Sequence, residues 1–529
     1  NITFEHGSKL TSFSNSLFQN CTSLNAIEIP SSITNIGSYA FSGCTNLSSV
    51  TFKQPSALTT INSYAFQNCT SLTSIDLPDS VTTINSNAFT GSSLTEFVIP
   101  TGVSNLNQNV FSGCSKLETI KIKDNSNLKT ISNYAFQNLT VLKTIEIGSS
   151  VTSIGTYAFS GCTRLTNIIF KSPSSLTTIN SYAFTNCTGL KQIDIPNSVN
   201  SIANYAFNNC SNLEKVNINN LQSWMNITFG GTSANPLIYA GNLYLNNVLV
   251  NELVVPQSIT TIKSYAFYGC QSITGIKLSN SVTTISSYAF QNCYGVSSIE
   301  IPSSVTSIGT SAFSANHKLV HIRDNRTSPS SSAFPTNPDR EYITSGNFVN
   351  DLKNEGNYRT YTIKNENGEV VKKYLIGLVD YSIKTINNLS TYGITEIYQY
   401  AFYNNKVLTE ITIPNTVTSI GKHAFYNCSG LTSITIPNSV TKISGHAFSN
   451  CTSLKELYIE DGDLTLYWGD YDYYFVNCPI EKVYLGRNLV FEGLFEHGWF
   501  NGVSNMISSL TIGNCVTRID NRSKENKLI

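Results

Sequence analysis

The residues of this chain most able to do chemistry are its thirteen cysteines, which could act as metal ligands, disulfide partners or nucleophiles. Twelve of them stand three residues after a phenylalanine, and Asn316 and Asn405 take the same place in other copies. A position that accepts cysteine or asparagine predicts a buried ladder of free side chains that satisfy backbone groups. Disulfides or metal binding are the disfavoured alternative, because no Cys-x-x-Cys spacing occurs. The predicted structural ladder consists of Cys44, Cys69, Cys162, Cys187, Cys210, Cys270, Cys293, Cys428 and Cys451.

Two histidines, His423 and His446, replace tyrosine at the same place in adjacent copies of the motif. They could bind a metal together, but no Asp, Glu or Cys cluster completes the ligand set. We therefore predict two surface histidines and no metal site. Phosphate-binding loops and the His-Glu-x-x-His and Gly-x-Ser-x-Gly motifs are absent from the sequence. The sequence thus predicts a protein that is not an enzyme and uses no cofactor.

The elements that position these residues are repeats. A Ser-Tyr-Ala-Phe-x-x-Cys motif returns about every 23 residues along most of the chain, which is typical of a solenoid of stacked coils. In each coil, an alternating segment such as Ile27-Glu28-Ile29 predicts one short parallel strand with the isoleucines inward. Proline follows this strand in eight coils and ends its ladder. The predicted fold is an α/β-type solenoid of short parallel strands with irregular or 3-10 turns.

These features resemble the leucine-rich repeat family, in its BspA-like or treponemal-type subclass. The string Ile-x-Ile-Pro-x-x-Val-x-x-Ile-Gly-x-x-Ala-Phe-x-x-Cys-x-x-Leu carries the resemblance at 411–431, and at 299–319 with Asn316 in the cysteine place. The resemblance covers most of the chain and implies a leucine-rich repeat horseshoe or curved rod. It also implies a surface protein that mediates adhesion, as in bacteria and parasitic protists.

Changes in the phenylalanine spacing divide the chain into segments. Residues 323–386 lack the repeat pattern. They contain Asn367-Gly368, which is typical of a hairpin turn, and we expect this insertion to be either functional or a mobile linker. We predict a leucine-rich repeat block at 1–322 with an enlarged degenerate repeat at about 219–256, a non-repeat insertion at 323–386, a second leucine-rich repeat block at 387–520 and a polar tail at 521–529.

Composition limits the partners. The net charge is zero and only 12% of residues are charged, which argues against nucleic-acid binding. No apolar run is long enough to span a membrane. The chain does not begin with Met and starts inside a repeat, so we expect a processed or truncated fragment whose leader and anchor are not visible. We predict a cell-surface or secreted location, with a protein or glycan ligand on a host or neighbouring cell surface. Low net charge also leaves room for self-association.

The outward side chains of the predicted strands form the candidate binding surface, since solenoids bind partners on their concave sheet. Its charged members are Glu28, Asp76, Glu96, Lys121, Glu146, Asp194, Lys277 and Glu300. The sequons least tied to the repeat pattern are candidate glycosylation sites, namely Asn46, Asn138, Asn325 and Asn388. A recurring tyrosine two residues before each phenylalanine predicts packing between coils, with an exposed aromatic stripe as the alternative.

Three functions fit these observations. The leading hypothesis is a non-enzymatic adhesion or recognition protein that binds a macromolecule across the concave sheet. The first alternative is a structural protein that assembles into a filament or a surface coat. The second alternative is an intracellular protein–protein scaffold, which the unpaired cysteines allow.

Overall fold

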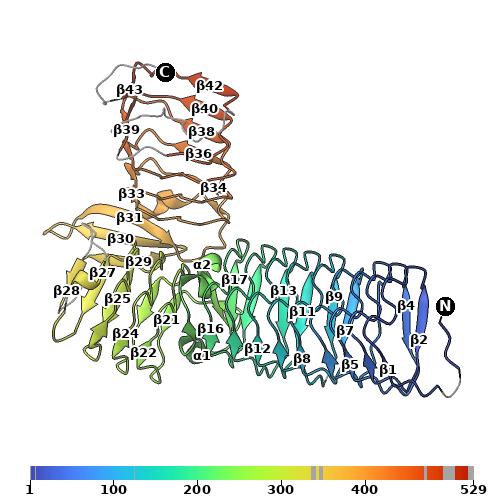
Figure 1. Ribbon diagram of the computed structural model, residues 1–529. Coiled ribbons are helices and arrows are strands. Elements are labelled where there is room, and N and C mark those ends of the chain that lie inside the picture. Colours follow the sequence, from blue (N-terminus) through green and yellow to red (C-terminus); the bar gives the residue numbers. More distant parts are fainter. Residues whose placement is uncertain are drawn as a thin grey trace.

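The chain forms a solenoid of parallel strands in two arms that meet at a bend (Figure 1). The computed structural model describes residues 2–5, 8–123, 125–329, 331–334, 341–344, 350–469, 474–491 and 507–521. The first arm runs to β28 (Glu341–Ile343), and the coils of the second begin near β33 (Glu396–Ile397). Each arm is close to straight in Figure 1. The predicted solenoid is therefore confirmed, as two rods joined at a corner and not as an evenly curved horseshoe.

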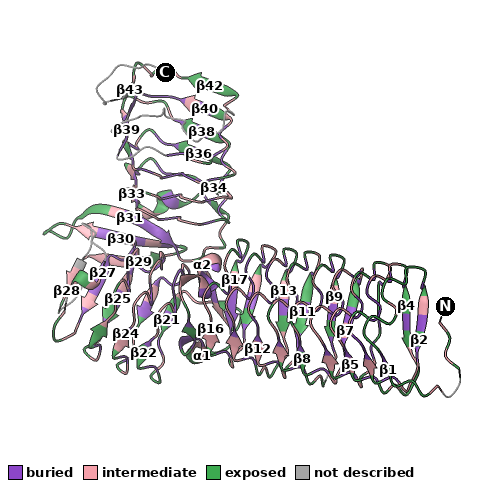
Figure 2. Cartoon of the chain, in the orientation of Figure 1, coloured by how far each residue is buried: buried purple, intermediate pink, exposed green. Residues whose placement is uncertain are grey.

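The longer strands recur in most coils and are buried on one side, although the coil that contains Leu72 and Leu77 has none. In β2 (Ala26–Ile29), Ile27 and Ile29 are buried while Glu28 is exposed, and Figure 2 shows similar alternation in other strands. Neighbouring strands pair in parallel, so Glu28 lies opposite Thr51. The other longer strands of this arm are β4 (Ser49–Phe52), β7 (Glu96–Ile99), β9 (Thr119–Ile122), β11 (Thr144–Ile147), β13 (Asn167–Phe170), β15 (Gln192–Ile195), β17 (Lys215–Ile218), β21 (Glu252–Val254), β23 (Gly275–Lys277), β25 (Ser298–Ile301) and β27 (His321–Asp324).

A second, shorter strand occurs in most coils, which corrects the prediction of one strand per coil. Most regular coils also contain an apolar residue that is followed three residues later by an Ile, as Ile33 is by Ile36. The last two residues of this segment are extended and pair in parallel with the same two residues of the next coil, as Asn35-Ile36 does with Thr60-Ile61. These strands are β1 (Ser12–Phe13), β3 (Asn35–Ile36), β5 (Thr60–Ile61), β6 (Thr83–Ile84), β8 (Asn105–Leu106), β10 (Thr130–Ile131), β12 (Ser153–Ile154), β14 (Thr178–Ile179), β16 (Ser201–Ile202), β18 (Thr228–Phe229), β22 (Thr261–Ile262), β24 (Thr284–Ile285) and β26 (Ser307–Ile308).

The core of the first arm is a column of phenylalanine rings. Phe159, Phe184 and Phe207 are fully buried, and their ring centroids lie 5.2 and 5.3 Å apart. Burying one such ring contributes about 1.5–3 kcal/mol. The turn that carries the ring also bonds between coils, because the Phe159 N–H donates to the Ala183 carbonyl (2.8 Å). Each coil is therefore held by its neighbours through both side chains and backbone.

One enlarged coil interrupts the first arm. Its segments are α1 (Leu221–Met225), η1 (Thr232–Ala234), α2 (Leu237–Ala240), β19 (Leu243–Leu245) and β20 (Val248–Leu249). Trp224 is buried, and its indole N–H donates to the Ala266 carbonyl (3.0 Å). This bond ties the helix to the next regular coil. Within the described part of the chain, neither α-helix has the length or apolar character needed to cross a bilayer.

An antiparallel unit forms the corner between the arms. β29 (Asp351–Glu355), β30 (Tyr358–Lys364) and β31 (Val370–Leu378) pair antiparallel, and β31 then pairs parallel with β33. Lys318 of the first arm donates from Nζ to the carbonyl of Ala401 in the second (2.8 Å). The corner also contains η2 (Ser331–Ala333) and η3 (Leu389–Tyr392).

The second arm repeats the construction of the first around its own buried cluster. Its strands are β32 (Thr385–Ile386), β34 (Glu410–Ile411), β35 (Ser419–Ile420), β36 (Ser433–Ile436), β37 (Lys442–Ile443), β38 (Glu456–Ile459), β39 (Leu466–Trp468), β40 (Lys482–Leu485), β41 (Leu489–Phe491), β42 (Ser509–Ile512) and β43 (Ile519–Asn521). The polar tail expected at 521–529 lies outside the described residues except for Asn521.

Candidate functional site

The cysteine ladder is buried and its sulfur atoms are unbridged. All thirteen cysteines are free thiols, and all but Cys21 and Cys515 are buried. Most ladder thiols donate to the carbonyl of the phenylalanine one coil earlier, as Cys187 Sγ does to Phe159 (3.1 Å). Burial raises the pKa of the Cys162 thiol to about 12, so it stays protonated and unreactive at neutral pH.

Asparagine also forms hydrogen bonds with backbone groups where it replaces cysteine. Asn316 Oδ1 accepts from the Cys293 N–H (2.9 Å), and Asn405 Oδ1 accepts from the Val407 and Leu408 N–H groups (both 3.0 Å). The side chains at this place therefore bond to backbone groups of the turns. In the part of the chain that the structure describes, no group of three or more His, Cys, Asp or Glu side chains could hold a metal ion.

The tyrosines two residues before each phenylalanine form a second column at the surface. They have left-handed backbone, with φ of 56° at Tyr157 and 59° at Tyr182, which costs a bulky residue about 1–2 kcal/mol. Their rings stack between coils, and the Tyr157 and Tyr182 centroids are 4.7 Å apart at an angle of 6°. Tyr205 remains 39% exposed. The tyrosines thus pack between coils and also present a stripe to solvent.

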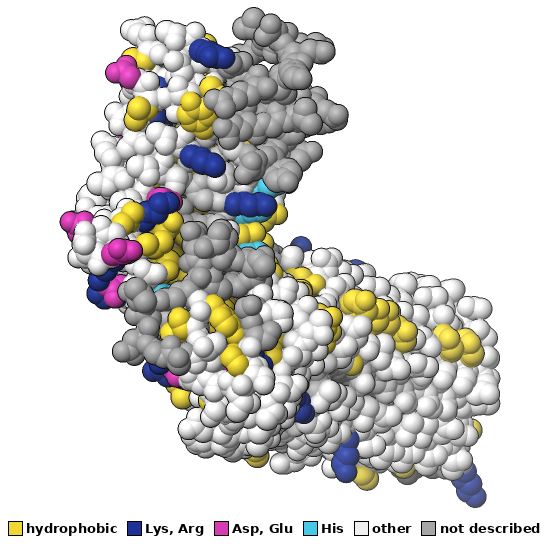
Figure 3. Space-filling model, turned by 90° about the vertical axis from the view of Figure 1, so that its left-hand side faces the viewer, with side chains coloured by type: hydrophobic (Ala, Val, Ile, Leu, Met, Phe, Trp, Pro, Cys, Tyr) yellow, Lys and Arg dark blue, Asp and Glu magenta, His cyan; other side chains and the backbone are white. Residues whose placement is uncertain are grey.

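At the corner, a row of mixed rings runs from one arm to the other. His317 of the first arm stacks on Tyr400 of the second at 4.1 Å. Tyr400, His423 and His446 then follow at 4.9 and 5.0 Å, with interplanar angles of 12° and 10°. Figure 3 shows hydrophobic and histidine side chains together where the arms meet. The two histidines predicted at the surface are therefore members of a ring stack.

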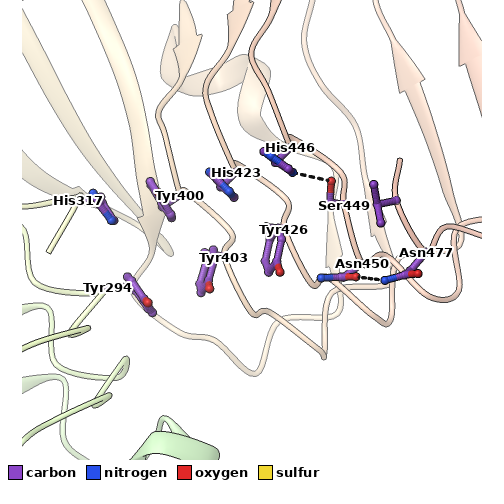
Figure 4. A pocket seen from close by; sticks show the side chains of 11 residues that line it. Tyr294, His317, Tyr400, Tyr403, His423, Tyr426, His446, Ser449, Asn450 and Asn477 are labelled. Carbon is purple, nitrogen blue, oxygen red and sulfur yellow. Dashed lines mark hydrogen bonds between the residues drawn. The ribbon is translucent and has the colours of Figure 1, made fainter. Parts of the chain in front are cut away.

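A second row of rings runs beside the first (Figure 4). Tyr294 of the first arm lies 4.5 Å from Tyr403, which stacks on Tyr426 at 5.1 Å. We call the hollow along both rows the aromatic groove, and it has a volume of about 430 Å³. It is lined by Tyr294, His317, Tyr400, Tyr403, His423, Tyr426, His446, Ser449, Asn450, Val476 and Asn477.

Burial sets the protonation of the groove. It lowers the pKa of His423 to about 4, and the nearby His446, Lys422 and His317 lower it further. It also raises the pKa of Tyr400 to about 12, with a smaller contribution from Tyr403. His423 is neutral and Tyr400 keeps its hydroxyl proton at neutral pH.

The sequence left the second row of the groove unidentified. Tyr403 and Tyr426 each follow a buried phenylalanine directly, a place where most copies have a polar residue. That exchange of polar for aromatic in two adjacent copies was the available signal. Tyr294 and His317 had none, because they join the rows only through the contact between the arms.

Seven of the eight predicted strand-face residues lie on the exposed side of strands, whereas Asp76 lies in the segment 72–78, which is exposed at that residue but forms no strand. Glu28, Asp76, Glu96, Lys121, Glu146, Asp194, Lys277 and Glu300 are all exposed. Lys277 lies directly opposite Glu300 on the neighbouring strand. Glu28, Asp76 and Glu96 form no ion pair with any described residue. The rows bring these side chains onto one face but into no enclosed site.

The later members of the rows pair with their neighbours. Glu146 pairs with Lys171 (3.3 Å), and Lys277 pairs with Glu252 (2.9 Å). Asp194 accepts from Asn217 (2.6 Å) beside a smaller pocket of about 240 Å³ at the ends of β13 and β15. Exposed pairs of this kind contribute at most about 1 kcal/mol, so the pairing leaves the face open to a partner.

The four candidate glycosylation sites differ in their surroundings. Asn46 and Asn138 are exposed on turns. Asn325 donates to Glu300 (2.9 Å), and Asn388 accepts from the Tyr358 hydroxyl. A glycan at either of the last two positions would have to break that bond, so Asn46 and Asn138 are the sterically simpler acceptors.

Comparison with known proteins identifies the repeats. A family model described as the BspA type leucine rich repeat region (6 copies) matches residues 1–118, 50–166, 107–235, 239–364 and 380–496. The chain belongs to the BspA-type leucine-rich repeat family. The resemblance carried by the repeat string is therefore confirmed. A comparison with curated proteins finds no match.

Several solved structures are similar to this BspA-type chain. A leucine-rich repeat protein from Bacteroides ovatus is 19% identical, with 95% of this chain and 87% of that one covered and a TM-score of 0.38. A leucine rich cell surface protein from Faecalibacterium prausnitzii is 23% identical, with 87% and 86% covered and a TM-score of 0.28. The pneumococcal vaccine antigen PcpA is 19% identical, with 89% and 85% covered and a TM-score of 0.30.

Proposed function

We propose that this BspA-type protein is a non-enzymatic recognition protein, secreted or on a cell surface, that binds a macromolecule across the exposed strand face. The single observation that carries the proposal is the set of exposed side chains aligned from strand to strand, as with Lys277 opposite Glu300. Such a face offers a wide contact area without an enclosed pocket, which suits a protein or glycan partner.

The charge of the face favours one kind of partner. Glu28, Asp76 and Glu96 lie on the face of the first arm and form no ion pair with described residues. Because unpaired carboxylates attract a basic patch and raise its association rate, we propose that the first arm recognises a protein or cell surface with clustered lysines and arginines.

Binding of the whole chain to cells or immobilised surface proteins tests this proposal. The triple variant E28Q/D76N/E96Q should reduce the association rate by about tenfold at low salt, and the loss should shrink as salt screens the charges. The matched control E118Q/E366Q/D463N neutralises three exposed carboxylates outside the rows and should leave binding unchanged. Equal losses in both variants, or binding that is independent of the triple change, would contradict the strand face as the binding surface.

The proposed surface location has its own test. A chain that passes through a secretory pathway with N-glycosylation should carry a glycan at Asn46 or Asn138, the two exposed acceptors. Mass spectrometry of the chain purified from its own cells detects it. A chain with no modification and an exclusively cytosolic fraction would favour an intracellular scaffold instead.

A further inference from the structure

The aromatic groove has features of a binding site that is separate from the strand face. Its lining combines aromatic rings with a few hydroxyl and amide groups, a mixture typical of small-molecule and oligomer sites. Among the described residues that line it there is no Lys, Arg, Asp or Glu, and Lys422 lies beside it near His423 and His446. A polyanion such as RNA needs clustered cations, which a single lysine beside the groove does not supply, and a lining without carboxylates does not select a basic peptide.

The groove is periodic along the arm. Two adjacent coils contribute one ring to each row, Tyr400 with Tyr403 and His423 with Tyr426, and the next coil adds His446 to the first row and Ser449 to the second. The steps between rings of the second arm are 4.9 and 5.0 Å in the first row and 5.1 Å in the second. A surface of equal steps is complementary to a ligand of equal units. A small isolated ligand would use only one step.

The rings present their edges to the open side of the groove. Tyr403 and Tyr426 stack face to face at 8°, so ring edges with hydroxyl groups line the groove. Tyrosine hydroxyls and neutral imidazoles both donate and accept hydrogen bonds, and the carbon edges between them are apolar. Beyond the rings, Asn477 donates to Asn450 (2.6 Å), which continues the polar line.

This pattern matches a sugar chain better than a peptide. Each sugar unit presents hydroxyl groups and C–H groups together, at a repeat comparable with the ring spacing. Peptide grooves use an open strand edge or deep aliphatic pockets. The groove has a single aliphatic lining residue, Val476, and no strand edge lines it among the described residues.

We propose that the aromatic groove binds a neutral, unbranched and extended oligosaccharide that lies along the second arm with one sugar unit per coil. The hydroxyl and imidazole groups of the rows would bond to the sugar hydroxyls, while the ring edges contact the C–H groups. Recognition of a basic partner by the first arm does not depend on this site.

Calorimetric titration of the whole chain with cellohexaose tests the proposal. We expect binding that strengthens from cellotriose to cellohexaose, because each added unit reaches another coil. The double variant Y403A/Y426A should weaken cellohexaose binding by about tenfold or more, since it removes both tyrosine contacts of the second arm's second row. The matched control Y157A/Y182A removes two stacked tyrosines from the first arm and should bind like the unmodified chain.

A second variant separates ligand contacts from folding. Y403F/Y426F keeps both rings and removes only the hydroxyl groups, so it should fold normally and lose several-fold in affinity. Maltohexaose has a curved chain and should bind more weakly than cellohexaose. The proposal is overturned if cellohexaose does not bind at millimolar concentration, if Y403F/Y426F and Y157A/Y182A bind alike, or if polyuridylate alone binds with a steep salt dependence.

Discussion

The arms and the corner of this molecule are stabilised by different kinds of residue. In the arms, the buried side chains are mostly uncharged and each packs against its own kind in the next coil, as Phe184 does between Phe159 and Phe207. At the corner, Lys318 and His321 are buried, with 2% and 3% of their surface exposed. Repetition makes the interfaces between regular coils of an arm equivalent, while the corner is a single interface with its own polar contacts.

This difference between the arms and the corner predicts which part of the molecule unfolds locally first. Burying an ammonium group against neutral acceptors is costly, and among the described residues the Lys318 Nζ donates to the Ala401 carbonyl and the Tyr381 hydroxyl, both neutral. His321 is buried against Tyr361 at the same corner. We therefore expect the corner to have a lower local stability than the coils on either side of it.

The largest effect is expected from a change in the middle of an arm. Phe184→Ala removes one ring from the column and leaves a cavity, which should lower the free energy of unfolding by about 3–5 kcal/mol. Denaturant unfolding gives the value, and hydrogen exchange should place the loss in the coils on both sides of residue 184. A loss at the corner instead would show that the arm is not held by its column.

Acid should weaken the corner before the arms. Burial, with the charge of Arg359, lowers the pKa of His321 to about 4 from 6.5, while Asp351 opposes the shift. The unfolded chain binds this proton below pH 6.5 and the folded chain does not until about pH 4. Stability is therefore full above pH 6.5 and falls on acidification through that window, by on the order of 3 kcal/mol.

Hydrogen exchange of β27 and β31 at several pH values measures this effect. The variant His321→Phe keeps an aromatic ring and loses the titrating group, so its protection should vary less between pH 6.5 and 4. A variant with the full pH dependence of the unmodified chain would remove His321 from the explanation.

A smaller effect is expected within the thiol ladder. Cys187→Ser keeps a donor for the Phe159 carbonyl but buries a more polar group, which should lower the unfolding free energy by about 1 kcal/mol. The exposed Cys21→Ser serves as control and should stay within about 0.5 kcal/mol. If Cys187→Ser lowered the unfolding free energy by more than about 3 kcal/mol, the thiol would stabilise the fold by more than its packing and its one hydrogen bond.

The smallest effect should come from the tyrosine column. Tyr182→Gly removes two stacking contacts, with Tyr157 and Tyr205, of about 0.5–1.5 kcal/mol each, but it also relieves a left-handed backbone that costs about 1–2 kcal/mol. The two changes should nearly cancel, so the melting temperature should stay close to that of the unmodified chain. Tyr182→Ala loses the ring and keeps most of the strain, and it should be the less stable of the two.

The repeats were predictable from sequence because their physics is local. The alternation at Ile27-Glu28-Ile29 and the phenylalanine column depend only on the spacing within one coil. The second short strand, as at Asn35-Ile36, was not predicted, because a two-residue extended segment has no period of its own. Nor was the position of His317 against Tyr400, since residues 83 positions apart meet only after both arms have formed. The strand-face binding residues and the domain boundaries remain predictions.

Counting thiols in the native chain tests the central claim most directly, namely that uncharged, unbridged columns hold the arms together. With a thiol reagent and no reductant, the account predicts fast reaction at Cys21 and Cys515, protection of the eleven buried cysteines, and thirteen reactive thiols after denaturation. Fewer than thirteen thiols after denaturation would reveal disulfides, and rapid reaction of Cys162 or Cys187 in the folded chain would place the ladder in solvent; either result would contradict the account.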